Sequence, residues 1–425
     1  MMQKIKINDN ISLNFISMTK LKTTSLGVYI HRPLNKKEAS YNALLPLVLK
    51  SASREYKSRE EVAQALDDLY GATMGAATLK LGEDHIIYFD AETISDKYTP
   101  EGDKLLSGLL KLLMSIVFNP KADNGAFDEK IVEQEKKNAI DKIEAFINDK
   151  RQYASLRCQA ETARGTDFAV MRYGDKDIIE KITPTTLYDY YKSIITSAVR
   201  DIYICGEADL DKMAETVKEF VSQLEFTKAS ITKTEILRRE ISGINEITEK
   251  MDVTQGKLSM GFLTNTKPGD ADSAALTVFN SLFGAGAHSK LFNNVREKLS
   301  LAYYASSQLE KYKGMLIVNA GIEFENFEKA YKEVLEQLNE IKNGNISEHE
   351  FAASILTIEN MCNSYYDDQR ALATFYVSES VAGTNRTLEE YLAKIKKVPV
   401  DDVKRVANKL ELDTVYFLAG KGDKA

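Results

Sequence analysis

The chain has 425 residues, about three times the usual length of one domain, so it is long enough to bury two hydrophobic cores. Its 56 Lys and Arg against 63 Asp and Glu give a net charge of -7, which argues against a protein built around nucleic acid or an anionic membrane surface. With 44% hydrophobic and 28% charged residues, the composition also excludes extensive disorder.

In the first half of the chain, a strand pattern is followed by helical patterns. Residues 24–33 (TSLGVYIHRP) are rich in β-branched and aromatic side chains and end at a turn, which is typical of a strand. An apolar helical stretch comes next, and residues 127–146 form a long helical pattern opened by acidic side chains. Residues 180–210 then predict an amphipathic helix and a short buried strand that ends at Gly206.

The second half repeats these patterns in the same order. A strand pattern near residue 260, a helical pattern at 346–365 and a helix-strand pattern at 393–423 match the three segments of the first half. So long a period, seen only twice, indicates a duplicated domain and not a solenoid. We therefore predict homologous domains at 1–225 and 246–425, joined by a polar, charge-rich linker at 226–245.

The mixture of strands and helices within each half predicts the fold class. Neither half shows the strict strand-helix alternation of a doubly wound fold. We predict an α+β fold in which each domain is a largely antiparallel sheet with helices packed on one face.

Cysteines and apolar runs indicate the compartment. The three cysteines, Cys158, Cys205 and Cys362, lie far apart and form no C-x-x-C pair, so neither a disulfide framework nor a thiolate zinc site is encoded. The most apolar run, residues 105–118, is short and contains Lys111, so we predict no membrane span. Together these features predict a cytoplasmic protein.

The most specific segment is residues 279–308 (FNSLFGAGAHSKLFNNVREKLSLAYYASSQ). It contains a Gly-rich turn with Gly284 and Gly286, then S-K-L-F at 289–292, V-R-E-K at 295–298 and L-A-Y at 301–303. In residues and spacing it resembles the second-domain signature of the pitrilysin/insulinase-like metallopeptidases, in the branch of the mitochondrial processing peptidase subunits. With the twofold repeat, the resemblance covers essentially the whole chain and implies half of a peptide-binding clamshell.

At the positions of the family's zinc site, this chain has other residues. Active members carry H-x-x-E-H on a helix of the first domain, with two histidines binding zinc and the Glu activating water, and a further Glu on a later helix. Alignment places Asn42 and Pro46 at the histidine positions, Leu45 at the catalytic Glu and Lys142 at the later ligand. None of these side chains performs the required chemistry, so we expect no zinc in this chain and zinc only in a partner chain. Pro46 also predicts that the helix begins or kinks there.

Arg296 and Tyr303 are retained from the same signature. The resemblance implies that they hold the scissile carbonyl of the substrate, because a guanidinium and a phenol are donors suited to a developing oxyanion. Their spacing of seven residues, two helical turns, suggests that they share a helix face. In the alternative interpretation, Arg296 pairs with Glu297 on a solvated helix and Tyr303 belongs to the core.

The Gly-rich turn and a His-containing strand start leave alternatives open. Gly284 and Gly286 are similar to the substrate-handling loop of non-catalytic subunits, or they form a tight turn between two helices. Asp84 and His85 follow a Gly-Glu turn, where one imidazole and neighbouring carboxylates would bind a divalent ion weakly or simply begin a strand.

The sequence thus predicts an inactive-type subunit of a processing metallopeptidase. By resemblance, it would contribute Arg296, Tyr303 and half of a peptide-binding chamber to a homologous H-x-x-E-H partner, as a heterodimer, with a homodimer as the other possibility. The expected substrate is a peptide or unfolded polypeptide, with no nucleic acid or membrane. One alternative is a non-catalytic peptide-binding or scaffolding module. Another, a self-standing zinc endopeptidase, conflicts with the residues at 42, 45, 46 and 142.

Overall fold

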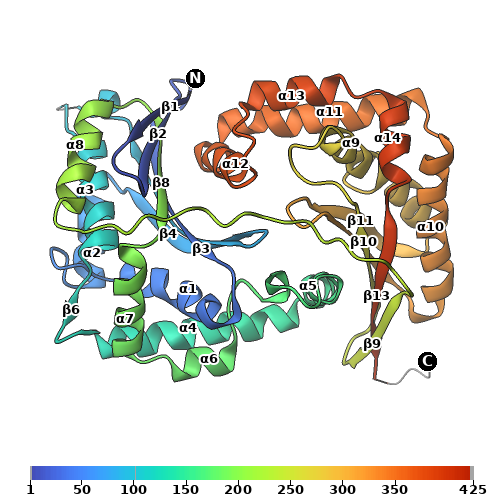
Figure 1. The fold of residues 1–425 in the computed structure, drawn as a ribbon, viewed down its shortest axis with the longest axis horizontal. Coiled ribbons are helices and arrows are strands. Elements are labelled where there is room, and N and C mark those ends of the chain that lie inside the picture. The colour runs from blue at the N-terminus through green and yellow to red at the C-terminus, as the bar shows by residue number, and fades with distance from the viewer. Residues whose placement is uncertain (1, 101, 422–425) are drawn as a thin grey trace. The chain divides into compact units, whose positions relative to one another are not determined.

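The computed structural model describes residues 2–100 and 102–421, whose contacts divide into two compact units. Unit 1 runs to Ile143 and also contains Val170–Lys233 and Tyr365–Val381. Unit 2 comprises Glu144–Ala169, Thr234–Ser364 and the chain from Ala382 onward. Figure 1 shows the elements of both units.

Unit 1 is built on a six-stranded sheet with helices on its apolar face and with α12 (Gln369–Val381) on the opposite face (Figure 1). In spatial order its strands are β1 (Met2–Lys6), β2 (Ile11–Ser17), β8 (Val199–Gly206), β3 (Thr23–Pro33), β5 (Asp84–Ile94) and β4 (Thr73–Leu81). Its helices are α1 (Lys36–Leu49), α2 (Arg59–Asp68), α3 (Leu105–Phe118), α4 (Glu129–Asn148), α6 (Lys176–Lys181), α7 (Pro184–Ile195), α8 (Leu210–Val221) and α12 (Gln369–Val381). A two-stranded ribbon, β6 (Ala122–Asp123) and β7 (Ala126–Phe127), precedes α4.

Alternation along β3 explains how the two faces of this sheet differ. Leu26, Val28 and Ile30 point into the hydrophobic core that α1 and α3 complete. Tyr29 and His31 lie on the opposite face, where Tyr29 stacks on Tyr88 of β5 with ring centroids 6.0 Å apart. One face of the sheet is therefore an apolar core, and the other carries aromatic and ionisable side chains.

Unit 2 contains a five-stranded sheet. In spatial order its strands are β11 (Ala302–Glu310), β12 (Met315–Ile322), β10 (Gly256–Leu263), β13 (Glu411–Gly420) and β9 (Asn245–Met251). Its helices are α5 (Lys150–Thr162), α9 (Ser273–Phe283), α10 (Phe327–Asn343), α11 (Glu348–Ser364), α13 (Leu388–Lys396), α14 (Val400–Ala407) and the π-helix η3 (Leu291–Lys298). Unit 2 has 3-10 turns at Asp167–Ala169 and Phe324–Asn326, and unit 1 has them at Asp96–Tyr98 and Tyr365–Asp367.

The two sheets have the same topology. The order β2-β8-β3-β5-β4 in unit 1 corresponds strand by strand to β9-β13-β10-β12-β11 in unit 2. In each, the first pair (β2 with β8, β9 with β13) is parallel and the other pairs are antiparallel. The prediction of two homologous α+β domains with largely antiparallel sheets is confirmed.

Each unit also includes a helix from the other half of the sequence. Helix α12 packs against β3 and β8 of unit 1, and its Gln369 donates to the carbonyl oxygen of Thr23 at 2.8 Å. Helix α5 packs against β10, β12 and β13 of unit 2, where Tyr153 donates to Glu249 at 2.9 Å. The domain ranges predicted from sequence follow the repeats. In the packing units, α12 of the second half belongs to unit 1 and α5 of the first half belongs to unit 2.

Gly261 of β10 allows α5 to approach the sheet closely. A Cβ at this position would overlap Oγ1 of Thr162 and lie 3.1 Å from its Cβ. We expect Gly261→Ala to lower the free energy of unfolding by about 1–3 kcal/mol through overpacking, measured by urea denaturation followed by circular dichroism. Gly243→Ala, where a Cβ meets nothing within 4 Å, is the matched control.

A double variant tests whether Thr162 is the cause. Adding Thr162→Ala to Gly261→Ala should cost less than the sum of the single changes, because the clash is then relieved. Strict additivity of the two changes would show that α5 does not press on β10 at this point.

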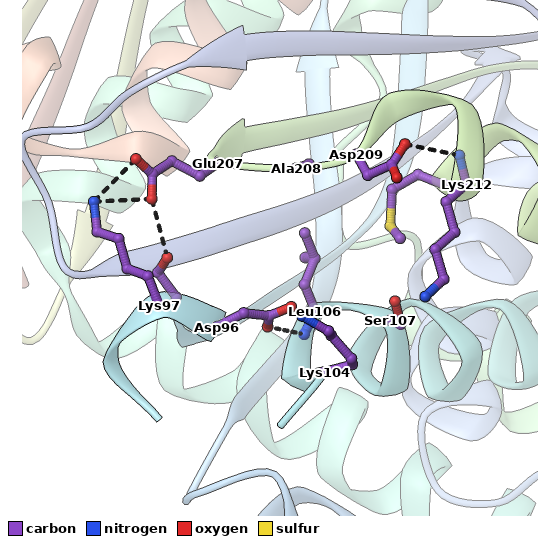
Figure 2. A pocket seen from close by; sticks show the side chains of 11 residues that line it. Asp96, Lys97, Lys104, Leu106, Ser107, Glu207, Ala208, Asp209 and Lys212 are labelled. Atoms are coloured by element: carbon purple, nitrogen blue, oxygen red, sulfur yellow. Dashed lines mark hydrogen bonds and ion pairs between the residues drawn. The ribbon is translucent and has the colours of Figure 1, made fainter. Parts of the chain in front are cut away.

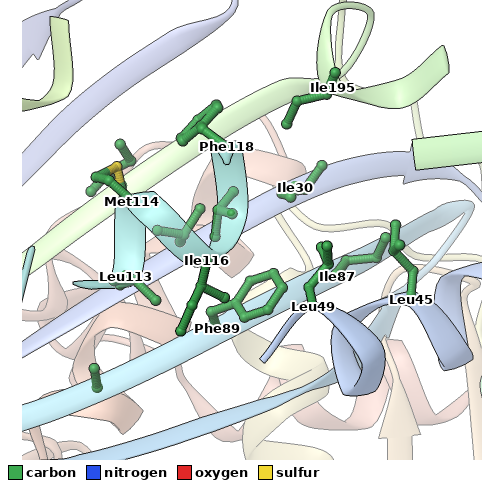
Figure 3. Packing of buried hydrophobic residues seen from close by; sticks show 14 of the residues in the cluster. Ile30, Leu45, Leu49, Ile87, Phe89, Leu113, Met114, Ile116, Phe118 and Ile195 are labelled. Atoms are coloured by element: carbon green, nitrogen blue, oxygen red, sulfur yellow. The ribbon is translucent and has the colours of Figure 1, made fainter. Parts of the chain in front are cut away.

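The core of unit 1 surrounds the end of α1. Figure 3 shows Leu45 and Leu49 beside Ile87 and Phe89 of β5, with Ile116 and other α3 side chains completing the cluster. Such packing removes the apolar side chains from water, which is the main favourable contribution to folding. Over the ranges 2–100 and 102–421, no helix combines the length and the apolar character needed to cross a membrane.

Candidate functional site

Helix α1 carries the positions of the degenerate zinc motif. It begins after Asn35, whose side chain accepts a hydrogen bond from the backbone N–H of Glu38 at 2.9 Å, and continues through Pro46 to Leu49. The prediction that the helix begins near Pro46 is wrong. The Asn35 cap starts it almost three turns earlier, and Pro46 falls in the last turn, where only one backbone hydrogen bond is lost.

Asn42 is fully buried, and its side chain forms hydrogen bonds with the uncharged side chains of His85 and Tyr190. Its amide nitrogen lies 3.1 Å from Nδ1 of His85, and its oxygen accepts from the Tyr190 hydroxyl at 2.6 Å. The other imidazole nitrogen, Nε2, lies 3.0 Å from the carbonyl oxygen of Arg172 and so carries the proton. Burial lowers the pKa of His85 to about 4, which keeps the ring neutral. These groups satisfy one another and leave no lone pair for a metal.

The remaining motif positions are equally unsuited to zinc. Leu45 is completely buried in the hydrophobic core, and the ammonium group of Lys142 on α4 lies 5.1 Å from the ring centroid of Tyr173. Across residues 2–100 and 102–421, no three His, Cys, Asp or Glu side chains are grouped as metal ligands. The residues present do not fit zinc, since they offer an amide, an alkyl group, a ring and a cation.

Asp84 and His85 are not assembled as a divalent-ion site. Their side chains leave β5 on opposite faces, as successive residues of a strand do. His85 belongs to the Asn42 network, whereas Asp84 Oδ2 lies 2.6 Å from Nδ1 of His31. The structure favours the interpretation of a strand that begins after the turn at 82–83.

His31 lies at the centre of a buried ionic group. Its Nδ1 contacts Asp84 on β5, and its Nε2 lies 3.3 Å from Oδ2 of Asp201 on β8. Ser12 donates a short hydrogen bond to the same aspartate. Although burial alone would lower it, the two carboxylates raise the pKa of His31 to about 10, so the ring is an imidazolium at neutral pH. The sequence patterns did not indicate this group because its members are far apart in the chain.

Arg296 and Tyr303 border one hollow of about 340 Å³ in unit 2. Arg296 lies on η3, 3.5 Å from Glu297, and its guanidinium is 4.6 Å from the ring centroid of Phe292. Tyr303 lies on β11, and its side chain is 53% exposed, so it is not a core residue. The lining residues are Arg296, Glu297, Ser300, Leu301, Ala302, Tyr303, Glu323 and Asn326.

The expectation that Arg296 and Tyr303 share a helix face is wrong. Helix η3 ends at Lys298, and Ser300 adopts a left-handed backbone with φ of 51°, which turns the chain into β11. The two donors reach one hollow from a helix and from a strand. The predicted pair of Arg296 with Glu297 is present as well.

Glu323 also lines this hollow, although the sequence did not indicate it. It follows the end of β12, and its carboxylate accepts a short hydrogen bond from the Tyr303 hydroxyl. This bond raises the pKa of Tyr303, so the phenol remains a donor. Only the antiparallel register, in which Ala302 faces Ile322, brings these residues together.

The Gly-rich turn is explained by packing at its first glycine. A Cβ on Gly284 would lie 2.5 Å from the backbone nitrogen of Ser307, which donates to the Gly284 carbonyl at 3.0 Å. A Cβ on Gly286 would meet the ring of His288 at 2.7 Å. This geometry is that of a tight turn between α9 and η3; a substrate role for Gly284 and Gly286 stays a prediction.

A second hollow, of about 400 Å³, lies in unit 1 (Figure 2). Its three acidic groups all have structural partners: Glu207 pairs with Lys97 at 2.8 Å, Asp96 accepts from the Leu106 N–H at 3.1 Å, and Asp209 caps α8. In this hollow, Asp96 and Asp209 therefore accept hydrogen bonds from the first turns of α3 and α8. Its side chains serve the fold and do not form a candidate active site.

These features define a class of protein: a twofold-repeated α+β metallopeptidase-like chain whose own zinc positions have been replaced. Residues 181–357 match the family model described as "Peptidase M16 inactive domain". The chain is 35% identical over 410 residues, 96% of both chains, to "Probable inactive metalloprotease YmfF" of Bacillus subtilis. It is 24% identical to an uncharacterized zinc protease of Mycobacterium leprae, with 86% of this chain and 78% of the relative covered.

Solved structures agree with this class. A conserved protein from Enterococcus faecalis has a TM-score of 0.90 at 29% identity, with both chains fully covered. A protease from Helicobacter pylori shares the fold, with a TM-score of 0.81 at 15% identity over 99% of both chains. The chain belongs to the pitrilysin/insulinase-like (M16) metallopeptidase family, and it is a metalloprotease-like member that lacks H-x-x-E-H at the motif positions.

Proposed function

We propose that this chain is the substrate-positioning subunit of a two-chain processing peptidase. The observation that carries the proposal is the hollow that Arg296 and Tyr303 both line. In the same chain, the zinc-ligand positions hold Asn42, Pro46 and Lys142, and the catalytic Glu position holds Leu45. A homologous partner with H-x-x-E-H would supply zinc and the water-activating Glu. The proposed substrate is a peptide or unfolded segment, and the proposed compartment is the cytoplasm.

The chemistry assigned to this chain is hydrogen-bond donation. Arg296 has five N–H donors, and its contacts with Glu297 and Phe292 leave it 41% exposed. Tyr303 is kept protonated by Glu323 and would transfer its hydrogen bond to a substrate carbonyl oxygen. Two donors directed at an oxygen that gains negative charge stabilise that charge more than the neutral carbonyl.

The test is a cleavage assay with a library of unstructured peptides. The chain alone, an H-x-x-E-H homologue from the same genome alone, and their mixture are compared. We expect cleavage only in the mixture. Arg296→Ala should lower kcat of the mixture by about 100-fold, because one donor to the oxyanion is lost, and Tyr303→Phe should lower it about tenfold.

Lys298→Ala, on the same helix but outside the hollow, is the matched control and should leave cleavage unchanged. Thermal unfolding of each variant checks that the fold is retained. If the homologue cleaves equally well alone, or if Arg296→Ala leaves the mixture unaffected, the shared site is disproved. Peptide binding without cleavage would then support the alternative of a non-catalytic binding module.

A further inference from the structure

A separate niche in unit 2 combines three aromatic rings with two carboxylates. It has a volume of about 150 Å³ and lies between β9, β13 and α10. Phe327 and Tyr331 come from α10, and Phe417 comes from β13. Glu246 on β9 and Glu328 on α10 supply the two carboxylates. None of these residues belongs to the Arg296 hollow.

The rings form a fixed aromatic wall. The ring centroids of Phe327 and Phe417 are 4.6 Å apart at 47°, and those of Phe327 and Tyr331 are 6.3 Å apart and nearly parallel. Gly256 makes this arrangement possible, because a Cβ there would lie 2.7 Å from the Phe417 ring. All three rings are partly exposed, so the wall faces a space that a ligand can enter.

The two carboxylates give the niche a negative potential. Glu246 and Glu328 line the niche together with Tyr331. Burial and then the charges of both carboxylates raise the pKa of the Tyr331 phenol. Glu328 has a loose ion pair with Lys332 at 3.9 Å, and both side chains are largely exposed, so this pair contributes little. Glu246 has no ion pair within the described part of the chain.

Aromatic faces and carboxylates select the same kind of ligand. A ring attracts a cation to its face through its quadrupole, and a carboxylate attracts it by charge. An alkylammonium group satisfies both, because its methylenes pack on the rings while its N–H groups reach the carboxylates. We infer that this niche binds an organic ammonium ion, either a lysine side chain of a polypeptide or a free alkylamine. This inference does not depend on the proposed function.

Ligand-observed saturation-transfer NMR on the full chain tests the inference. The probes are N-acetyl-lysine methylamide, propylamine and N-acetyl-norleucine methylamide, an uncharged analogue of the lysine compound that lacks the ammonium group. We expect the two amines to bind with a Kd on the order of 1 mM, and the norleucine compound to bind at least about threefold more weakly. A lower Kd for the lysine compound than for propylamine points to a polypeptide source, and equal values point to free amines.

Variants locate the binding. Tyr331→Leu should weaken amine binding about threefold, and the double change Glu246→Gln with Glu328→Gln about tenfold. Because both glutamates are exposed, the double variant keeps its fold, and Glu325→Gln outside the niche is the matched control. Equal binding of the norleucine compound, or unchanged amine binding in the double variant, would overturn the inference.

Discussion

Replacing His31 by Gln is expected to lower the free energy of unfolding by about 3–5 kcal/mol at pH 6.5. The reason is that the imidazolium is the cation between Asp84 and Asp201, and its loss leaves two buried carboxylates without a counter-charge. Urea unfolding followed by circular dichroism measures the change in the transition that reports unit 1. His349→Gln is the matched control, because His349 is exposed at the start of α11.

The pH dependence separates this effect from simple loss of packing. The pKa of His31 is raised to about 10, so its contribution is complete below about pH 6.5 and is lost as the pH rises toward 10. The pKa of His85 is lowered to about 4, so its contribution is lost as the pH falls from about 6.5 toward 4. Stability should therefore be greatest near pH 6.5.

Above that pH the parent protein should lose up to about 1.4 kcal/mol per pH unit through His31. The Gln variant should lack this decline between pH 7 and 9, since Gln does not titrate. A variant that unfolds at the parent's urea concentration, or that keeps the same decline, would show that His31 is not the charged centre of the group.

Leu45→Glu, which restores the catalytic Glu of the family motif, is expected to destabilise unit 1 by about 3 kcal/mol or more. Leu45 is completely buried among core side chains, with Ile87 beside it (Figure 3), so the new carboxylate would have neither water nor a partner. Leu45→Met, which conserves volume, should cost less than about 1.5 kcal/mol and is the matched control.

The sign of the pH effect gives a second readout. Burial would raise the pKa of the new carboxyl above its unfolded value, so Leu45→Glu should be least destabilised in acid and lose stability as the pH rises. A Leu45→Glu protein of parental stability would contradict the burial argument. So would stoichiometric zinc in the triple variant with Asn42→His and Pro46→His, measured by atomic absorption.

Some features of the site could be predicted from the local sequence, and others could not. The sequence alone indicates the loss of the zinc motif, because the required chemistry depends on residue type. No packing turns Pro46 into a zinc ligand or Leu45 into a base that activates water. The Asn42 network was not readable, because its partner His85 lies on another strand and Tyr190 on another helix. The spacing of Arg296 and Tyr303 predicted that both lie on one helix face. The prediction failed because the helix ends before Ser300, which has a left-handed backbone.

The amino-acid sequence by itself determined the α+β class, the two homologous halves and the absence of zinc-binding side chains at the motif positions. The first two depend on periodicity and repetition, which can be followed along the sequence without knowledge of its contacts. The third depends on residue chemistry at positions that the family resemblance identifies. Only the tertiary structure decided that α5 and α12 pack in the unit of the opposite half and that His31 lies between two carboxylates. It also decided that Glu323 meets Tyr303. These pairings join residues distant in the chain, and strand register and close packing, not local propensity, bring them together.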